Sequence, residues 1–220
     1  MKYPHFFLGA ASLAALLVFA FQPGLGAEVG VLGGFTCSRF SSPGLSWTYD
    51  LGYSVGAFAN LRWTRALRLQ AELRFSSARS EAVIPIRYFS YRQDVKLGKT
   101  IQSVELPLML HVYPFDWSII RPNVQLGAYG AVNVHGQDRL DYQGASHTEN
   151  IEDELHRFNA GFLVGVGIDF HEGRILWHLS VLWRIPLNPL AANDLGQRID
   201  STGFLISLGA GLWNPGGRAQ

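Results

Sequence analysis

The feature that most constrains the fold of this 220-residue chain is a period-two alternation of apolar and polar residues. Successive side chains of a β-strand point to opposite faces, so this alternation predicts strands with one apolar and one polar face. After residue 27 no helical period persists, and no apolar run reaches the length of a membrane helix. The clearest segment has Leu67, Leu69, Ala71, Leu73 and Phe75 in one phase and Arg68, Gln70, Glu72, Arg74 and Ser76 in the other.

The alternation recurs in segments that can each supply the roughly 9–11 residues of a tilted membrane strand. We therefore predict an all-β fold, a membrane-embedded up-and-down antiparallel β-barrel of about eight strands. The predicted strands span residues 28–38, 51–61, 67–76, 101–113, 123–135, 158–170, 175–185 and 204–212.

Alternation alone does not say which phase faces inward, because a soluble barrel also alternates, with its apolar phase inside. The interior of an eight-stranded barrel is just filled by side chains, whereas the apolar phase here offers roughly forty mostly bulky residues. Charged residues make up only 16% of the chain, against about 25% in soluble domains. We therefore expect the apolar phase to face lipid, and a soluble barrel or sandwich is the less favoured alternative.

The N-terminus has the layout of a secretory signal peptide: Lys2, an apolar run over residues 6–21, and then Pro-Gly and small residues up to Ala27. We predict a signal peptide at 1–27 and a single barrel domain at 28–220. A transmembrane anchor is the alternative, although the run is short for a span. Without Lys2 the mature chain carries 17 basic and 17 acidic residues, so its charge does not indicate nucleic acid as a partner.

The connections between the predicted strands alternate in length. In bacterial outer-membrane barrels the short turns are periplasmic and the long loops extracellular, and an even strand number then places both mature termini in the periplasm. Residues 79–99 hold five basic and two acidic residues, and residues 138–154 hold six acidic and one basic. We expect these two connections to contact one another over the barrel mouth. The short connections are 62–65, 114–120 and 171–173; the long ones are 39–50, 82–99, 136–154 and 188–201.

Aromatic residues gather near the predicted turns, where a membrane interface would lie, because indole and phenol rings favour the headgroup region. Trp47, Tyr49, Tyr53 and Tyr88 lie near the long connections. Outer-membrane lipid and lipopolysaccharide are therefore expected partners, with the barrel-assembly machinery acting during insertion. We interpret four residues as interface aromatics: Trp63, Trp117, Trp177 and Trp213.

Short motifs give the mature chain a family resemblance. They are Gly-Val-Leu-Gly-Gly-Phe at 30–35, Val-Glu-Leu-Pro-Leu at 104–108, Arg-Pro-Asn-Val at 121–124 with Gly127, and the paired strands from Asn159 to Ile185. On these residues the chain resembles the PorT-like outer-membrane β-barrel family of Bacteroidota, a small OmpA/OmpX-type barrel. The resemblance implies a barrel with a porin-like or unknown role, one branch being implicated in protein secretion. The C-terminus departs from the usual ending, because seven residues follow Trp213.

Charged residues in the polar phase are predicted to face the lumen. Unpaired charges in a confined space cost several kcal/mol, so they should pair across strands or hold water. We interpret them as a structural network that fills the barrel and, alternatively, as a constricted conduction path. The predicted network comprises Arg68, Glu72, Arg74, Glu105, His111, Arg121, Asp169, His178 and Arg184.

No motif indicates catalysis: the chain has no phosphate-binding loop, no Gly-x-Ser-x-Gly and no His-Glu-x-x-His. Cys37 is the only cysteine, which excludes an intramolecular disulfide and multi-cysteine metal sites. The acidic residues Glu149 and 152–154 are interpreted as a solvated loop rather than a metal site. We therefore predict no catalytic residue, metal or cofactor, although Ser146, His147 and Glu149 are residue types found at the rim of outer-membrane lipid enzymes.

Three functions remain, in order of preference. The first is a non-enzymatic barrel with a polar, largely filled lumen, whose long extracellular loops bind an envelope or extracellular partner, with protein secretion as one setting. The second is a narrow porin-like channel for small solutes. The third, much less favoured, is an outer-membrane lipid-modifying enzyme.

Overall fold

The computed structural model describes residues 27–41, 45–88, 91–115, 119–142, 145–151, 155–189, 191–192 and 198–213. None of these residues belongs to a helix long and apolar enough to cross a membrane. The signal peptide expected at 1–27 lies, apart from Ala27, outside the described residues. Its cleavage and the extent of the single barrel domain at 28–220 stay predictions.

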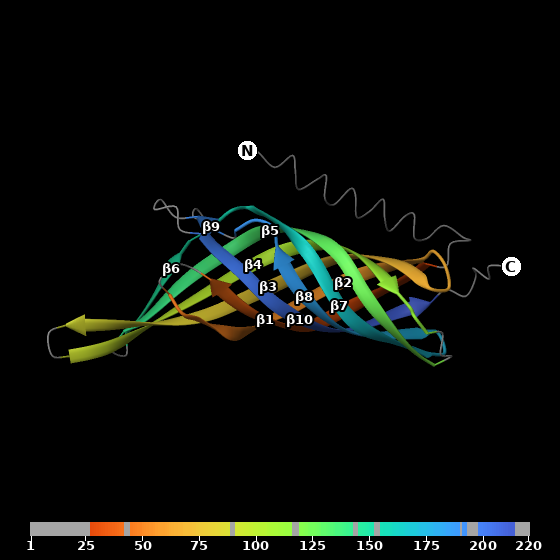
Figure 1. Cartoon of the computed structure of the whole chain (residues 1–220), viewed down its shortest axis with the longest axis horizontal. Coiled ribbons are helices and arrows are strands. Elements are labelled where there is room, and N and C mark those ends of the chain that lie inside the picture. The colour runs from red at the N-terminus through yellow and green to blue at the C-terminus, as the bar shows by residue number, and fades with distance from the viewer. Residues whose placement is uncertain are drawn as a thin grey trace.

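Eight strands of the described chain close into one antiparallel ring (Figure 1). Neighbours in the ring follow chain order, and the pairing of β10 with β1 closes it. The predicted all-β, up-and-down antiparallel barrel is confirmed. The ring strands are β1 (Ala27–Ser41), β2 (Trp47–Arg62), β3 (Leu67–Tyr88), β4 (Tyr91–Val112), β5 (Ile120–Tyr142), β7 (Phe158–Glu172), β8 (Ile175–Pro186) and β10 (Arg198–Trp213); β6 (Ala145–Asn150) pairs with β5 and β9 (Ala191–Ala192) with β10.

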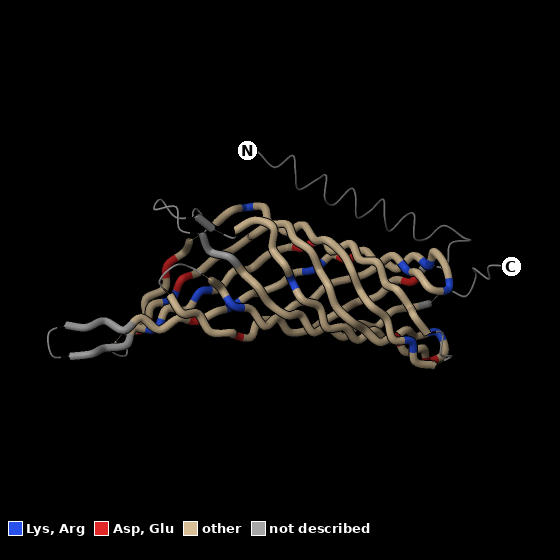
Figure 2. The backbone as a smooth tube through the Cα atoms, viewed as in Figure 1, with Lys and Arg blue, Asp and Glu red and all other residues tan. Residues whose placement is uncertain are grey.

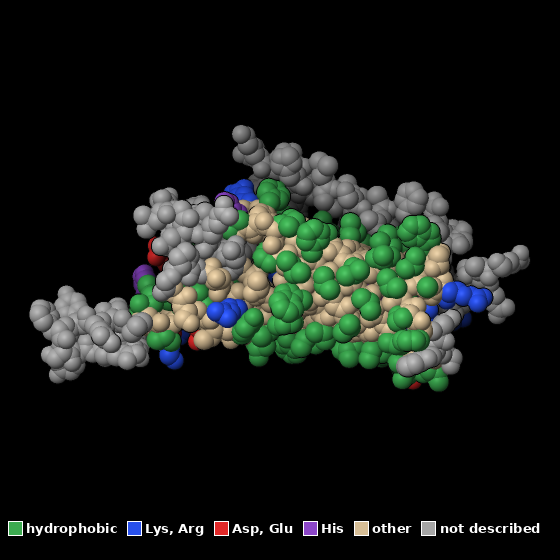
Figure 3. Space-filling view, in the orientation of Figure 1, with side chains coloured by type: hydrophobic (Ala, Val, Ile, Leu, Met, Phe, Trp, Pro, Cys, Tyr) green, Lys and Arg blue, Asp and Glu red, His purple; other side chains and the backbone are tan. Residues whose placement is uncertain are grey.

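The apolar phase faces outward. On β3, Leu69 is 41% exposed, whereas its neighbours Arg68 and Gln70 are at most 2% exposed. The same alternation runs along β7 and β8. Apolar side chains cover the middle of the barrel on the face seen in Figure 3, and most charged residues lie towards its two ends (Figure 2). So large an exposed apolar surface is not tolerated by a soluble monomer, so this belt is a lipid-facing surface.

The first and last ring strands begin and end at the same end of the barrel, where Glu28 lies opposite Trp213. The short connections are also here, and we call this the short-turn end. In the tightest connection Gly173 has a φ of 61°, as a two-residue turn between Glu172 and Ile175 requires. The opposite end is called the hairpin end.

Two of the predicted long loops are largely strands, and the loop prediction was wrong there. β3 and β4 stay paired as far as Tyr88 and Tyr91, and β5 continues to Tyr142 and pairs with β6. These strands project beyond the ring (Figure 1). Residues 137–142 and 145–150 are exposed or part-exposed on both faces, so no apolar phase marks them, and a polar strand resembles a loop in sequence. We call residues 82–88, 91–99, 136–142 and 145–150 the projecting sheet.

The two oppositely charged connections lie side by side as paired strands rather than as loops folded over the mouth. Lys96 is opposite Asp141, and Lys99 is opposite Asp138. Lys99 Nζ lies 3.0 Å from Asp138 Oδ1. Burial raises the pKa of Asp138, while Lys99 acts in the opposite direction.

Two of the four predicted interface tryptophans can be placed fully. Trp63 lies in the β2–β3 turn and Trp177 on the outward face of β8, with 76% and 36% of their surface exposed. Trp117 and the side chain of Trp213 lie outside the described residues. Trp47 is not part of an outer aromatic ring, because it is 4% exposed and packs edge-to-face on Phe40. A residue near a turn can face either the lumen or the membrane interface, so its position in the sequence did not show which of the two Trp47 faces.

A charge placed on the lipid-facing belt should destabilise the barrel. Val166 on β7 is 59% exposed, and Val166→Arg should cost about 2–4 kcal/mol because it puts a guanidinium in hydrocarbon. The matched control is Leu140→Arg on the projecting sheet, where the side chain stays in water and no comparable cost is expected. Urea unfolding in phosphocholine vesicles measures both. Equal stabilities of the two variants would mean that the belt does not face lipid.

Candidate functional site: a filled lumen

The nine predicted network residues lie at inward positions of the ring strands. Eight of them are buried, and Arg184 is partly buried. They fall into three groups of contacts, centred on the carboxylates of Asp169, Glu72 and Glu105.

Asp169 on β7 is the centre of the group nearest the short-turn end. Its Oδ2 accepts hydrogen bonds from Arg68 Nη1 at 2.7 Å and from the Tyr113 hydroxyl at 2.5 Å. Its Oδ1 lies 2.5 Å from His178 Nδ1 and 3.4 Å from Asn123 Nδ2. A buried carboxylate needs several charge-assisted or polar donors to offset its lost hydration, and here they come from β3, β5, β8 and the residue that follows β4.

Arg68 extends this group to the seam that closes the ring. Its Nη1 also lies 3.1 Å from Glu28 Oε2, and Glu28 accepts a hydrogen bond from Asn60 Nδ2 at 3.2 Å. Glu28 stands opposite Trp213, on the strand pair β1–β10. One guanidinium therefore connects a carboxylate on β1, the first strand of the ring, with one on β7.

Aromatic rings pack on the cations of the same group. The guanidinium carbons of Arg121 and Arg68 lie 4.5 and 5.1 Å from the centroid of the Tyr113 ring. Both distances suit cation–π contacts. His111 stacks on His178 with ring centroids 5.3 Å apart. The group therefore occupies the lumen at the short-turn end with rings as well as charges.

Glu72 forms the second group with its neighbours at alternate positions of β3. Arg74 Nη2 makes an ion pair with Glu72, and Gln70 Nε2 donates a hydrogen bond to it. All three side chains are at most 2% exposed. Alternate residues of a strand share one face, so β3 supplies both charges of this pair by itself.

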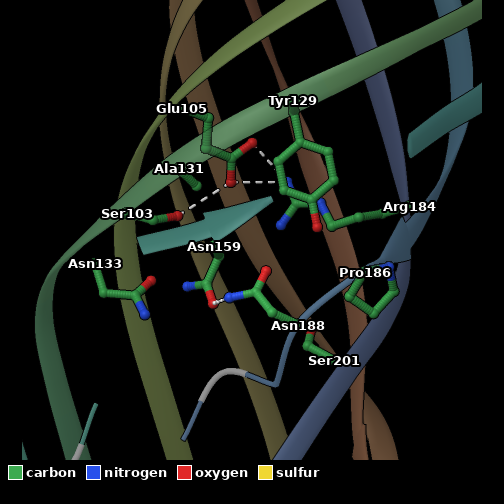
Figure 4. A pocket seen from close by; sticks show the side chains of 10 residues that line it. All are labelled: Ser103, Glu105, Tyr129, Ala131, Asn133, Asn159, Arg184, Pro186, Asn188 and Ser201. Carbon is green, nitrogen blue, oxygen red and sulfur yellow. Dashed lines mark hydrogen bonds and ion pairs between the residues drawn. The ribbon is translucent and has the colours of Figure 1, made fainter. Parts of the chain in front are cut away.

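Glu105 on β4 is the centre of the group nearer the hairpin end (Figure 4). Its two oxygens lie 2.8 and 2.6 Å from Arg184 Nη2, and the Ser76 and Ser103 hydroxyls donate to one of them. The Arg184 guanidinium lies 5.1 Å from the Tyr129 ring centroid. A pocket with room for about one water molecule opens beside the pair; Asn133, Asn159 and Asn188 also line it.

Apolar side chains also point inward, which the sequence analysis missed. Leu163 lies between the inward glycines Gly161 and Gly165 on β7, so the inward phase reads as small and polar. Apolar side chains in a narrow lumen exclude water. One buried cluster contains Met109, Tyr129, Ala131, Leu163, Leu182 and Leu205; another, towards the hairpin end, contains Phe40, Trp47, Ala78, Ala82, Ile101, Ile151 and Leu155.

Three polar residues of the Asp169 group were absent from the predicted network: Glu28, Tyr113 and Asn123. Glu28 follows directly on the predicted cleavage site, and Asn123 is uncharged, although both occupy inward positions. An inclusive reading of the inward phase would have found all three. Tyr113 is the last residue of the predicted strand 101–113 and has the same phase as Glu105 and His111, although β4 ends one residue earlier.

Of the three residues considered for a lipid enzyme, Ser146 lies on the other face of β6 from His147 and Glu149. Ser146 and His147 are consecutive in β6, so their side chains lie on opposite faces of the strand. Ser146 Oγ lies 3.1 Å from Arg139 Nε instead. In the described part of the chain, no group of three or more His, Cys, Asp or Glu residues is arranged to hold a metal ion.

Loss of the central carboxylate should destabilise the barrel more than loss of an exposed one. Asp169→Asn leaves Arg68 and His178 buried beside a neutral amide, and breaking such a buried pair costs about 3–5 kcal/mol. Asp141→Asn loses an exposed pair with Arg139 and should leave the stability unchanged. Urea unfolding followed by tryptophan fluorescence compares the stabilities of the two variants. Equal losses of stability would mean that Asp169 is not central to the stabilising network.

Several solved outer-membrane proteins are similar in structure. They include the attachment invasion locus protein Ail of Yersinia pestis (13% identity, TM-score 0.41), Neisserial surface protein A (15%, 0.43) and a major outer membrane protein of Thermus thermophilus (12%, 0.47). The matches cover 86%, 85% and 86% of this chain and 99%, 98% and 99% of those chains. Similarity at this level carries no argument about function. No curated protein matches the sequence.

A family model, in contrast, matches most of the chain. It is the model of the outer membrane protein beta-barrel domain, and the match covers residues 19–191. The matched range includes the ring strands from β1 to β8. Together with the closed ring and its lipid-facing belt, this match shows that the chain belongs to the outer membrane protein β-barrel domain family.

Proposed function

We propose that this protein is a non-enzymatic outer-membrane barrel with a filled lumen, which binds an envelope or extracellular partner through its projecting sheet. The observation that carries the proposal is the occupied interior. The Asp169 and Glu105 groups and two apolar clusters take up inward positions from the short-turn end to the hairpin end. Side chains just fill the interior of an eight-stranded barrel, so we assign the function to the outer surface rather than to conduction.

The short-turn end is proposed to lie in the periplasm. Its support is the gathering of the short connections at one end of the ring, the asymmetry typical of bacterial outer-membrane barrels. Both mature termini are then periplasmic, because β1 starts and β10 ends there. The projecting sheet stands outside the cell, beyond the lipopolysaccharide that surrounds the belt, after insertion by the barrel-assembly machinery.

Protein secretion is the setting that the PorT-like resemblance supports. The motif at 104–108 contributes Glu105 to the lumen, and the motif at 121–124 contributes Arg121 and Asn123. These motifs therefore build the barrel, and the partner surface lies elsewhere. The projecting sheet is the best candidate, because its strands extend beyond the ring and expose both faces of β6.

The purified barrel should not conduct ions measurably. In planar bilayers we expect no stable conductance steps, since ion pairs and apolar clusters occupy the lumen. A general porin in the same bilayers is the positive control. Stable nanosiemens conductance from the monomer would contradict the proposal and favour the channel.

A narrow hydrated path is the second candidate, and one observation favours it. Neither ring nitrogen of buried His111 has a hydrogen-bond partner among the described residues, and the same holds for Arg74 Nε. Buried polar atoms of this kind normally bind water. A pH-sensitive dye trapped in vesicles tests the path. Proton entry that Leu182→Ala accelerates would establish it, and entry no faster than in protein-free vesicles would exclude it.

Shortening the projecting sheet should abolish partner binding and leave the barrel folded. Replacing residues 83–96 and, in the same variant, residues 138–149 by Asn-Gly keeps Ala82 opposite Leu97 and Gln137 opposite Asn150, with a two-residue turn in each hairpin. After cross-linking in native membranes, quantitative mass spectrometry should show loss of the co-purified partner. Unfolding in urea is the control for the barrel. An unchanged set of cross-linked proteins would contradict the assignment of the projecting sheet.

A further inference from the structure

The pocket beside the Glu105–Arg184 pair lies at the mouth of the lumen, at the hairpin end (Figure 4). Two of its lining residues, Asn159 and Pro186, stand at or next to strand ends, because β7 begins at Phe158 and β8 ends at Pro186. On this side of the ring the pocket is therefore close to the rim, where a molecule outside the barrel can reach it.

One side chain in the pocket wall has an unused donor. Asn159 is 8% exposed, and its Nδ2 has no hydrogen-bond partner among the described residues. Its Oδ1 accepts a hydrogen bond from Asn188 Nδ2 at 3.3 Å, and its nitrogen is turned away from Asn188, towards Asn133 (Figure 4). A buried donor without a partner costs free energy, which an acceptor placed in the pocket would recover.

Other polar atoms at the same pocket are also available. Arg184 contacts Glu105 through Nη2 alone, and within the described part of the chain its Nε and Nη1 have no partner. Asn133 uses its Nδ2 on the His156 carbonyl at 2.7 Å, which leaves its Oδ1 as an acceptor. The Ser201 hydroxyl lines the pocket as well. The pocket therefore offers both donors and an acceptor.

The rim that carries these groups is held in place by its own hydrogen bonds. Asn188 Nδ2 donates to the Phe158 carbonyl at 2.7 Å, and Asn188 Oδ1 accepts from the Ala160 N–H at 2.7 Å. The Asn133 N–H donates to the Arg157 carbonyl at 2.9 Å. Groups that are ordered before a ligand arrives lose little conformational freedom on binding.

Charge and size restrict what the pocket can take. Glu105 already neutralises Arg184 at 2.6 and 2.8 Å, so an anionic ligand would have to compete with a carboxylate. A neutral hydroxyl can accept from one amide and donate to another. The pocket admits only about one water-sized group, and Ala131 and Pro186 add apolar atoms to its wall. A hydroxymethyl group, with one oxygen and one carbon, fits this combination.

A second small pocket favours a ligand that carries several hydroxyls. It shares Arg184 and Ser201 with the first, and it adds Ser38, which is 4% exposed and has no hydrogen-bond partner in the described residues. Neighbouring hydroxyls of one sugar can reach both pockets, whereas a serine side chain of a peptide has a single hydroxyl. The pair of pockets therefore fits a carbohydrate better than a peptide.

We propose that the mouth of the lumen binds a neutral carbohydrate, whose hydroxymethyl group enters the pocket beside Arg184. The hydroxyl oxygen accepts a hydrogen bond from Asn159 Nδ2 and donates one to Asn133 Oδ1, while its carbon packs on Ala131 and Pro186. The rest of the sugar stays at the rim. This inference goes beyond the proposed function, because it assigns a ligand to the lumen mouth and does not depend on the projecting sheet.

Paired probes test the chemistry of the ligand. The isotope-labelled barrel in detergent is titrated with methyl α-glucoside, and NMR follows the side-chain amide resonances of Asn159. A pocket for two non-hydrogen atoms supplies little affinity, so we expect saturable shifts with a Kd on the order of 10 mM. Methyl α-xyloside, which lacks the hydroxymethyl group, should bind at least about tenfold more weakly. Methyl glucuronide, with a carboxylate in its place, should bind no more tightly than the glucoside.

Two alanines of β5 provide matched variants. Ala131→Leu fills the pocket, whereas Ala128→Leu adds the same atoms on the exposed face of the strand. We expect the first to weaken glucoside binding at least about tenfold and the second to leave it within about twofold. Asn159→Leu removes the free donor without adding bulk and should also cost at least about tenfold, with the Asn133 amide as the reporter. Urea unfolding verifies that each variant is folded.

Five results would overturn the inference. Absence of saturable shifts at about 100 mM glucoside, roughly ten times the expected Kd, would mean that the pocket holds water only. Equal affinity for the glucoside and the xyloside would place the sugar elsewhere. Binding at least about tenfold tighter would indicate an anion site for the glucuronide and a peptide site for N-acetylserinamide. The fifth is unchanged glucoside affinity in the folded Ala131→Leu or Asn159→Leu variant. None of these results alters partner binding by the projecting sheet, so the two proposals fail separately.

Discussion

The structure depends on one costly arrangement, a carboxylate buried at the centre of a narrow lumen. Asp169 has no exposed surface, and its donors are Arg68, Tyr113, His178 and Asn123. They are brought together only when β3, β5, β7 and β8 are in register and the ring is closed. A slip of one residue turns a strand over and would move its charges into lipid. The network therefore ties the register of individual strands to closure of the whole barrel.

The need to pair buried charges also limits what the lumen can bind or conduct. Each of the four inward carboxylates described above is offset by a cation, as Glu105 is by Arg184, and apolar side chains such as Leu163 and Leu182 take up space between the polar groups. Among the described residues, every inward carboxylate already has a cation beside it, so none is left unpaired to bind a cationic solute. A conducting lumen needs the opposite arrangement, with a hydrated path and binding groups that are left partly open. This contrast supports our proposal that the projecting sheet, rather than the lumen, is the functional surface.

Sequence alone predicted the features that depend on the two faces of a strand meeting different surroundings, the lumen on one side and lipid on the other. Alternation at 67–76 identified a strand, and the count of bulky apolar residues decided that Leu69 faces out and Arg68 faces in. Specific pairings were not predictable, because they depend on strand stagger: Arg68 reaches Glu28 and Asp169, which lie far away in the chain. Trp47 and Leu163 were misplaced or missed because an inward apolar residue beside glycines leaves no periodic signal. The strands at 137–142 and 145–150 were predicted as a loop because exposure of both faces removes the alternation.

Strands that continue beyond the membrane gain little from burial, so their backbone pairing and a few ion pairs hold them together. Lys99 with Asp138 is such a pair, at the base of the projecting sheet. Extending a sheet into water also creates edges, and an open edge invites pairing with any other strand. The two edges here differ, because Pro85 lies on one of them and β6 contains neither proline nor lysine, the residues that protect an edge from such pairing.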